Sequence, residues 1–298
     1  MVPKARSVPR ARLLAVLISL AVLASFAASP PASAEVATAV PETMDLSVAP
    51  LYLALGDSVA YGVGAVLPPH GGYVARLHQR LHRELDCWPS KWFVRVPGCV
   101  GLWRTNHAVP GATSADLIRD QLPAAVAQLE ARNSDAFAFN EVRVVTLTVG
   151  GNDVFGPVLR ACGDPSSPAC ATTVADKLEQ VADNLSAILE ELATAAGPDT
   201  AIAVMTYYNP LGSCHLAGLT ELAGVVLEGG PLGGDGTVVP DGLNDIIRRS
   251  AERTGAVVAE THGVLQAEDL VGGLDCLHPD DSGHARIADA FAEVLLTR

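Results

Sequence analysis

The stretch that decides the fold is Leu51–Gly62, which reads Leu-Tyr-Leu-Ala-Leu-Gly-Asp-Ser-Val-Ala-Tyr-Gly. Its first half is an apolar run of strand length, and this run ends in Gly56-Asp57-Ser58 before a turn rich in small residues. In an open α/β sheet, chemistry takes place beyond the carboxyl ends of the strands, where loops are free to shape a site. Ser58 is therefore a candidate nucleophile. So short a motif more often marks a strand followed by a polar turn. Whether Ser58 is a nucleophile therefore depends on partner residues elsewhere in the chain.

The rest of the chain alternates strand-like with helix-like segments. The clearest strand is Val142–Val149, which is β-branched and mostly apolar. The clearest helix has one apolar stripe at three- and four-residue spacing from Val174 to Leu192. We expect further strands at 51–56, near 108, at 200–207 and at 255–260, and further helices at 72–85, at 114–129 with a restart at Pro123, from 243 and at 285–296. A loop bearing Cys162 and Cys170 is expected after Asp153, and a polar loop is expected at 275–284. This alternation predicts a parallel sheet with helices on both faces.

Residues 1–34 have the organisation of a secretory signal peptide. A positively charged start is followed by an apolar stretch, Leu13–Ala28, and by an Ala32-Ser33-Ala34 cleavage site. The apolar stretch is shorter than the ~20 residues that a bilayer requires, so cleavage is favoured over a membrane anchor. We therefore expect a secreted, extracellular protein that begins at Glu35 after cleavage, with a linker over 35–50 and one domain over 51–298.

The chain is acidic. It carries 20 Lys+Arg against 33 Asp+Glu, a formal net charge of −13, and loss of the leader with its four basic residues brings this to −17. Such a chain is not expected to bind nucleic acid or anionic lipid through charge, and it suits a neutral or weakly polar small-molecule or lipid substrate. No later segment is long and apolar enough for stable membrane insertion. We expect a monomer.

Six cysteines in a chain with a secretory leader indicate disulfides. Fifteen pairings are possible in principle. Sequential pairing is the simplest of them, and it joins Cys87–Cys99, Cys162–Cys170 and Cys214–Cys276. A zinc site is a weak alternative, because the sequence has no Cys-x-x-Cys motif and no Cys/His cluster with ligand spacing.

Four segments carry residue types that together suit attack on an ester. Ser58 needs a base, because a neutral hydroxyl is a poor nucleophile, and His278 can serve near neutral pH. Asp275 lies three residues before His278 and can accept a hydrogen bond from the second ring nitrogen, which fixes the tautomer. The oxyanion that forms needs donors. The Ser58 N–H, the Gly111 N–H and the Asn152 side-chain amide can supply them.

These residues lie in four blocks, which are Gly-Asp-Ser58, Val-Pro-Gly111-Ala-Thr-Ser, Gly-Gly-Asn152-Asp and Asp275-x-x-His278-Pro. Together and in this order, the blocks resemble the SGNH/GDSL hydrolase superfamily, in particular its secreted actinobacterial esterases and lipases. The resemblance implies a flavodoxin-like three-layer α/β/α sandwich with a central parallel sheet, and esterase or lipase activity without a metal or other cofactor. It implies that Ser58, Gly111, Asn152 and His278 are the four name-giving residues, with Asp275 completing the triad. It also implies three sequential disulfides.

Substrate preference stays open at this point. Residues 86–104 hold all three tryptophans, and a Cys87–Cys99 bridge would tether them as a flap. That flap is either an apolar wall for the substrate or a small satellite core. The apolar segment 216–228 is either a mobile lid or a short packed helix. The substrate class is an acyl ester, with an acetylated carbohydrate as the alternative. A non-catalytic secreted binding domain and a phosphoester hydrolase are rival readings.

Several residues near these blocks are expected to be structural. His107 and His262 have no Asp three residues earlier, unlike His278. His284 is expected to pack or cap at the start of the last helix. Asp57 is expected to orient the turn next to the serine by hydrogen bonds to the backbone.

Overall fold

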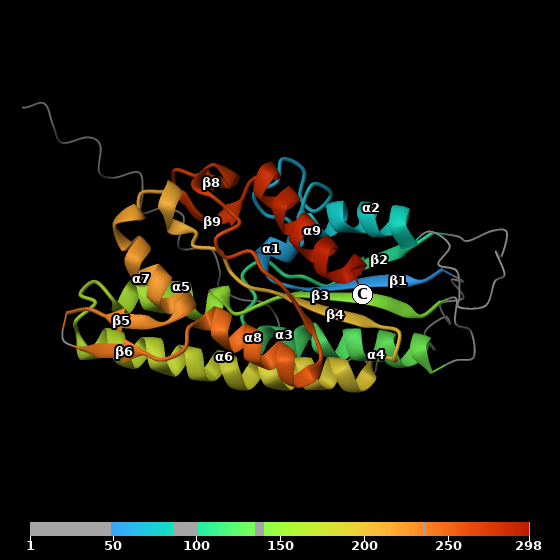
Figure 1. The fold of residues 1–298 in the computed structure, drawn as a ribbon, viewed down its shortest axis with the longest axis horizontal. Coiled ribbons are helices and arrows are strands. Elements are labelled where there is room, and N and C mark those ends of the chain that lie inside the picture. The colour runs from blue at the N-terminus through green and yellow to red at the C-terminus, as the bar shows by residue number, and fades with distance from the viewer. Residues whose placement is uncertain (1–48, 86–100, 135–139, 235, 298) are drawn as a thin grey trace, which may run out of the picture. The chain divides into compact units, whose positions relative to one another are not determined.

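The computed structural model describes residues 49–85, 101–134, 140–234 and 236–297. A five-stranded sheet runs through its centre in the order β2-β1-β3-β4-β7, and all neighbouring strands are parallel (Figure 1). This is the flavodoxin-like order 2-1-3-4-5 in a sheet of five. The strands are β1 (Leu51–Gly56), β2 (Trp103–Asn106), β3 (Val142–Thr148), β4 (Ala201–Met205) and β7 (Val257–Ala259). The predicted α/β fold with a central parallel sheet is confirmed.

Helices cover both faces of the sheet, as the alternation predicts. On one face lie α2 (Tyr73–Leu85) and α9 (Asp281–Leu296), joined by the stacked rings of Tyr73 and Phe291 at 5.1 Å. The other face is covered by α3 (Ser114–Asp120), α4 (Leu122–Asn133), α6 (Pro168–Ala195) and α8 (Leu243–Thr254). Pro123 lies in the first turn of α4, so the predicted restart of the helix there is confirmed.

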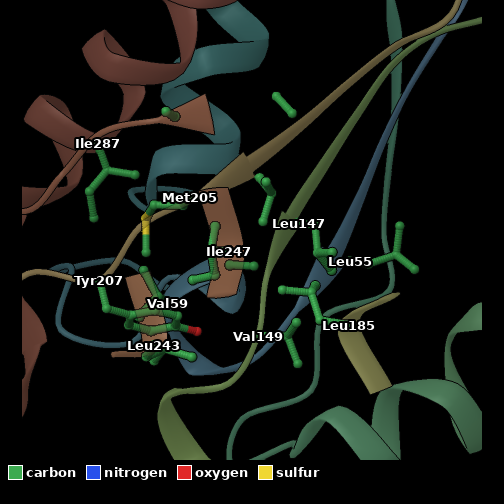
Figure 2. Close-up of a cluster of buried hydrophobic side chains, with 14 of the residues drawn as sticks. Leu55, Val59, Leu147, Val149, Leu185, Met205, Tyr207, Leu243, Ile247 and Ile287 are labelled. Carbon is green, nitrogen blue, oxygen red and sulfur yellow. The ribbon is translucent and has the colours of Figure 1, made fainter. Parts of the chain in front are cut away.

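The core is buried between the sheet and the two helical layers. All six residues of β1 are buried, because helices cover both faces of a central parallel strand. Figure 2 shows Leu55, Leu147 and Met205 from the strands meeting Leu185, Leu243, Ile247 and Ile287 from the helices. Each such side chain contributes roughly 1.5–3 kcal/mol by leaving water. This packing holds the strand ends at one edge of the sheet in fixed positions.

Two segments expected to be loops have regular structure. Residues after Gly150 form α5 (Gly151–Ala161), which begins at the third block and places Asn152 in its first turn. Residues 275–279 form β9 (Asp275–Pro279), which pairs antiparallel with β8 (Leu270–Gly272). Both expectations were wrong because short polar or mixed segments carry little periodicity, and tertiary pairing decides their state.

The connection between β4 and β7 is also folded. It contains α7 (Thr220–Glu228), two short 3₁₀ turns (Leu211–Ser213 and Ala217–Leu219), and a small hairpin of β5 (Gly230–Leu232) and β6 (Thr237–Val239). A third 3₁₀ turn, Ala267–Asp269, follows β7. Leu222, Val226 and Leu227 of α7 are buried. The apolar segment 216–228 therefore includes a short packed helix.

Two of the three sequential disulfides are present, Cys162–Cys170 and Cys214–Cys276. The first closes the end of α5 onto the start of α6. The second joins the segment after β4 to β9. The expected Cys87–Cys99 bridge and most of the tryptophan flap over 86–104 lie outside the described residues, although Trp103 belongs to β2 and is half exposed.

Candidate active site

Ser58, His278 and Asp275 come together at the carboxyl edge of the sheet. Ser58 is the first residue of α1 (Ser58–Tyr61), directly after β1, while the other two lie on β9. The His278 Nε2 atom is 2.9 Å from Ser58 Oγ. On the other side of the ring, His278 Nδ1 is 2.8 Å from Asp275 Oδ2. The three residues thus form a continuous hydrogen-bonded chain, although 220 residues separate the serine from the histidine.

Asp275 is held by its own strand. Its Oδ1 accepts the backbone N–H groups of Leu277 at 2.9 Å and His278 at 3.0 Å. Burial raises the pKa of this carboxyl, but these N–H donors together with the His278 side chain outweigh burial and lower the pKa below its ordinary value. Asp275 is therefore ionised at neutral pH, as a group that stabilises a protonated imidazole has to be.

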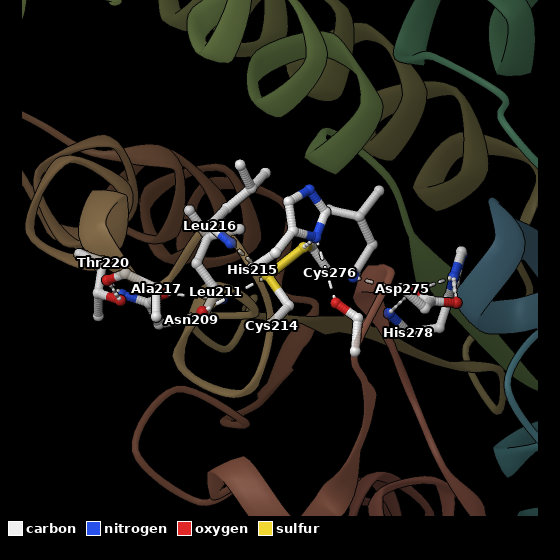
Figure 3. The surroundings of a disulfide bond; sticks show 12 residues. Asn209, Leu211, Cys214, His215, Leu216, Ala217, Thr220, Asp275, Cys276 and His278 are labelled. Carbon is white, nitrogen blue, oxygen red and sulfur yellow. Dashed lines mark hydrogen bonds and ion pairs between the residues drawn. A yellow bond between two sulfur atoms is a disulfide. The ribbon is translucent and has the colours of Figure 1, made fainter. Parts of the chain in front are cut away.

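The strand that carries His278, β9, is bonded to neighbouring segments at two points. Cys276, between Asp275 and His278, is bonded to Cys214 in the segment after β4 (Figure 3). The Tyr208 hydroxyl donates to the Leu277 carbonyl at 2.7 Å. A short two-stranded hairpin is weak alone, so these cross-connections hold His278 at its position.

The serine turn rests on Asp57, which is 2% exposed. Its side chain accepts the Val59 N–H at 2.9 Å and thereby caps α1, which confirms its expected role in the turn. It also accepts the hydroxyls of Thr148 at 3.0 Å and Tyr207 at 2.5 Å. Burial raises the pKa of Asp57, while these three donors act to lower it.

Gly56 brings the turn close to the neighbouring strand. It has φ +144°, and a Cβ there would lie 2.4 Å from the Thr148 carbonyl oxygen. Only glycine tolerates this approach and this backbone conformation. The N–H and carbonyl of Gly56 are further paired with the amide of Gln121, at 2.9 and 2.8 Å. The position of Ser58 is thus set by β1, by Thr148 of the neighbouring strand β3 and by Gln121 at the end of α3.

The three expected oxyanion donors lie on adjoining segments. The Ser58 N–H is at the first position of a helix, where backbone N–H groups have no intrahelical acceptor. Gly111 has φ +83° in the turn before α3. Asn152 Nδ2 donates one hydrogen to the Ala112 carbonyl at 2.9 Å, which leaves its second hydrogen for another acceptor.

Asp153 holds the second and third blocks together. Its carboxylate accepts the backbone N–H of Ser114 at 2.9 Å and the Ser114 hydroxyl at 2.6 Å. The start of α5 is therefore fastened to the start of α3. This link keeps Asn152 beside the Gly111 turn.

A cleft beside Ser58 has an aromatic wall that sequence reasoning did not single out. Ser58, Asn152 and His278 line it together with Phe155, Tyr207, Tyr208, Pro210 and Leu277. Phe155 comes from α5, and the two tyrosines follow β4 after a single residue, Thr206. The sequence offered one signal, since paired aromatics immediately after a buried strand lie at the edge where sites form.

Two of the other histidines, His284 and His262, have structural partners. His284 is buried, its Nδ1 accepts the Tyr73 N–H at 3.2 Å, and its Nε2 donates to the Val63 carbonyl at 2.9 Å. It therefore caps α2. His262 lies 3.2 Å from a carboxylate oxygen of Glu228. Within the described part of the chain, His278 is the histidine hydrogen-bonded to Ser58.

Cys214, His215 and Cys276 have ligand atoms within 4.8 Å of one another. Both sulfurs are joined in the disulfide, so neither is a thiolate available to a metal. The His215 ring lies near the bridge, with Nδ1 3.2 Å from the Gly273 carbonyl. This cluster is a structural feature of the bridge in its oxidised form.

The sequence of the protein matches the family model of the GDSL-like lipase/acylhydrolase family over residues 54–286. The chain belongs to that family. Members of the SGNH/GDSL hydrolases act on esters, and the chain is accordingly a hydrolase of acyl esters. The match spans all four blocks and the central sheet from Ala54 of β1 onward.

Individual relatives agree with this membership. Lipase 2 of Streptomyces coelicolor is 29% identical over 279 residues, which cover 82% of this chain and 85% of that protein. The lipase Lip_vut3 from a goat rumen metagenome has a similar fold, with TM-score 0.55 and 18% identity over 82% of this chain and 96% of the other. An extracellular lipase from Streptomyces rimosus has TM-score 0.51 and 19% identity over 84% of this chain and 99% of the other. In the described part of this GDSL hydrolase, none of the helices has the length and apolar character needed to cross a membrane.

Proposed function

We propose that this chain is a secreted serine esterase or lipase that cleaves carboxylic esters through an acyl-enzyme. The hydrogen-bonded chain from Ser58 through His278 to Asp275 carries the proposal. A hydroxyl 2.9 Å from an imidazole, whose other nitrogen is 2.8 Å from an ionised carboxylate, is the arrangement that makes serine nucleophilic.

In the first half-reaction, Ser58 Oγ attacks the ester carbonyl carbon while His278 Nε2 takes the hydroxyl proton. Asp275 stabilises the resulting imidazolium and keeps its ring in place. The carbonyl oxygen becomes an oxyanion that accepts hydrogen bonds from the N–H groups of Ser58 and Gly111 and from the Asn152 amide. Loss of one such donor costs roughly 10²–10³ in rate.

The tetrahedral intermediate then collapses. The bond to the alcohol oxygen breaks, the alcohol takes the proton from His278, and the acyl group stays on Ser58. Water attacks this acyl-enzyme with His278 again as base, and the second collapse returns the proton to Ser58 and releases the acid. Both half-reactions use the same groups.

The apolar and aromatic cleft beside Ser58 favours an acyl or alcohol group with a hydrocarbon part. Phe155, Tyr208 and Leu277 offer ring and aliphatic surface next to the nucleophile. Secretion is supported by the leader over 1–34 and by the extracellular lipase from Streptomyces rimosus among the similar structures.

The test is a panel of chromogenic esters of increasing acyl length. The wild type should hydrolyse them, and Ser58→Ala and His278→Ala should each lose at least 10³-fold in kcat/KM. The matched control is His262→Ala, which removes another histidine paired with a carboxylate but not with Ser58. A phosphonate ester should label the wild type at Ser58 and leave Ser58→Ala unlabelled. Wild-type rates in Ser58→Ala would refute the mechanism.

A further inference from the structure

The segments that surround the candidate site are almost free of charged side chains. Residues 58–75 and 105–115 contain no Asp, Glu, Lys or Arg, and residues 273–279 contain only Asp275, which is paired with His278. This is unusual in a chain in which 18% of residues are charged. We call these three segments the uncharged rim.

The uncharged rim also holds much of the exposed apolar surface. Six of the eleven exposed large hydrophobic side chains in the described part of the chain belong to it, namely Tyr61, Val66, Leu67, Val109, Leu274 and Leu277. Leu274 is 91% exposed and Val66 is 79% exposed. Leu274 directly precedes Asp275, and Leu277 directly precedes His278. Large apolar side chains are usually buried when a protein folds. A group of exposed ones around a site therefore indicates a contact surface.

The three segments adjoin one another. A Cβ on Gly64 would lie 2.1 Å from the Pro279 carbonyl oxygen, so the turn after α1 rests on β9. Asn106 Nδ2 donates to the Ala60 carbonyl at 2.9 Å, which joins the second segment to α1. In Figure 1 the loop that follows α1 lies on the same side of the sheet as α9, near the β8–β9 hairpin. The rim is therefore one surface, with Ser58 within it.

We propose that the uncharged rim docks on a zwitterionic or uncharged lipid surface and so presents the cleft to water-insoluble acyl esters. This inference rests on the proposed function, and it adds that the ester substrate is taken from a lipid surface. Docking removes few unpaired charges from water, because Arg76 and Asp116, which directly follow the first two segments, are paired with Asp281 at 2.8 Å and with Arg119 at 2.7 Å. The net charge of −13 disfavours an anionic surface.

A carbohydrate substrate would need a different surface. Sugar hydroxyls are recognised by fixed polar groups, whereas the rim offers Val, Leu and Tyr side chains to the solvent. The aliphatic groups of the rim suit acyl chains at a lipid–water boundary, where burial of apolar area drives the association.

Vesicle binding tests the proposal without catalysis. The protein is the mature Ser58→Ala chain, and the probe is phosphatidylcholine vesicles, with bound protein measured by sedimentation. Addition of Leu67→Asp and Leu274→Asp should weaken partitioning at least tenfold. The matched control adds Val238→Asp and Leu296→Asp, which place the same two charges at exposed apolar sites outside the rim, and should bind within twofold of the parent.

Soluble-ester turnover separates this inference from the proposed function. The same double substitution, Leu67→Asp/Leu274→Asp, is then made in the active chain that retains Ser58. This variant should hydrolyse a short soluble ester at a rate within twofold of the wild-type rate, but it should lose activity on a triacylglycerol emulsion. No partitioning of the parent, equal partitioning of rim and control variants, or tighter binding to phosphatidylglycerol than to phosphatidylcholine would each overturn the docking surface. A dimer converted to a monomer by the rim substitutions would instead assign the rim to self-association. If the wild type binds vesicles as expected but does not hydrolyse soluble esters, the proposed esterase activity is rejected and the docking surface is still supported.

Discussion

At the residue scale, the proposed function depends on the orientation of one imidazole. Asp275 Oδ2 faces His278 Nδ1 at 2.8 Å, and the same carboxylate organises the turn by accepting two backbone N–H groups. An amide in its place would keep the shape, but it could not stabilise the imidazolium and could hold the wrong tautomer.

Asp275→Asn should therefore lower kcat/KM for a soluble ester by about 10²–10⁴-fold, because the base loses its ionised partner. The measurement is steady-state hydrolysis together with the melting temperature. Asp241→Asn removes an exposed carboxylate paired with Arg249 and serves as the control, with unchanged rate. A full rate in Asp275→Asn would remove Asp275 from the mechanism.

The consecutive tyrosines 207 and 208 connect the two halves of the site. The hydroxyl of Tyr207 donates to Asp57 under the serine, and that of Tyr208 donates to Leu277 beside the histidine. Tyr207→Phe keeps the ring that lines the cleft and removes only the hydroxyl. We expect kcat to fall about tenfold with little change in KM, because one hydrogen bond of ordinary strength that holds the serine turn is lost. A raised KM with unchanged kcat would show that Tyr207 only lines the cleft.

At the element scale, His284 joins three parts of the fold. It lies on α9, caps α2 at Tyr73 and holds the loop after α1 at Val63. Burial lowers the pKa of His284 to about 4. The Nδ1 atom accepts a hydrogen bond, so protonation would break the α2 cap.

Acid stability follows from this histidine. Between its unfolded value of 6.5 and about 4, the unfolded chain binds more protons than the folded one, so stability falls as the pH is lowered. The loss attributable to His284 is up to about 3 kcal/mol. His284→Gln keeps an acceptor and a donor, and its free energy of unfolding should depend less on pH in this window. His262→Gln is the control. Equal pH slopes in the wild type and His284→Gln would contradict the assignment.

The two described disulfides differ in the element they hold. Cys214–Cys276 closes a separation of 62 residues and fixes β9, whereas Cys162–Cys170 closes 8 residues. Loop-closure entropy alone gives about 4 against about 2.5 kcal/mol. Replacing Cys214 and Cys276 by serine should therefore lower both the melting temperature and kcat more than the same change at 162 and 170. Equal losses in the two variants would show that the bridge has no special role in holding β9.

At the scale of the whole molecule, the signal peptide predicted over residues 1–34 indicates where the protein works. Expressed with its own first 34 residues, the chain should appear in the culture medium with Glu35 as its first residue, which mass spectrometry of the intact protein can establish. Retention of residues 1–34 on the isolated protein would contradict cleavage after Ala34.

Much of the molecule could be predicted from sequence. Strand and helix alternation depends on local periodicity, and so the sheet and most of its helices followed from hydrophobic patterning alone. The four blocks were also readable, because their residue types and order are visible without coordinates. The elements that were missed include α5 and β9, since Gly151–Ala161 and Asp275–Pro279 take their form from the neighbours they pack on.

The sequence by itself determined the α/β class, the order of the four blocks and the identity of the residues that could do the chemistry. The tertiary structure alone decided that Ser58 Oγ and His278 Nε2 lie 2.9 Å apart, that Tyr207 supports the serine turn, and that the uncharged segments adjoin in one rim. The physical reason is the separation along the chain over which each effect acts. Patterning acts over a few residues along the chain, whereas a site forms where packing of the sheet and its helices brings distant strand ends together.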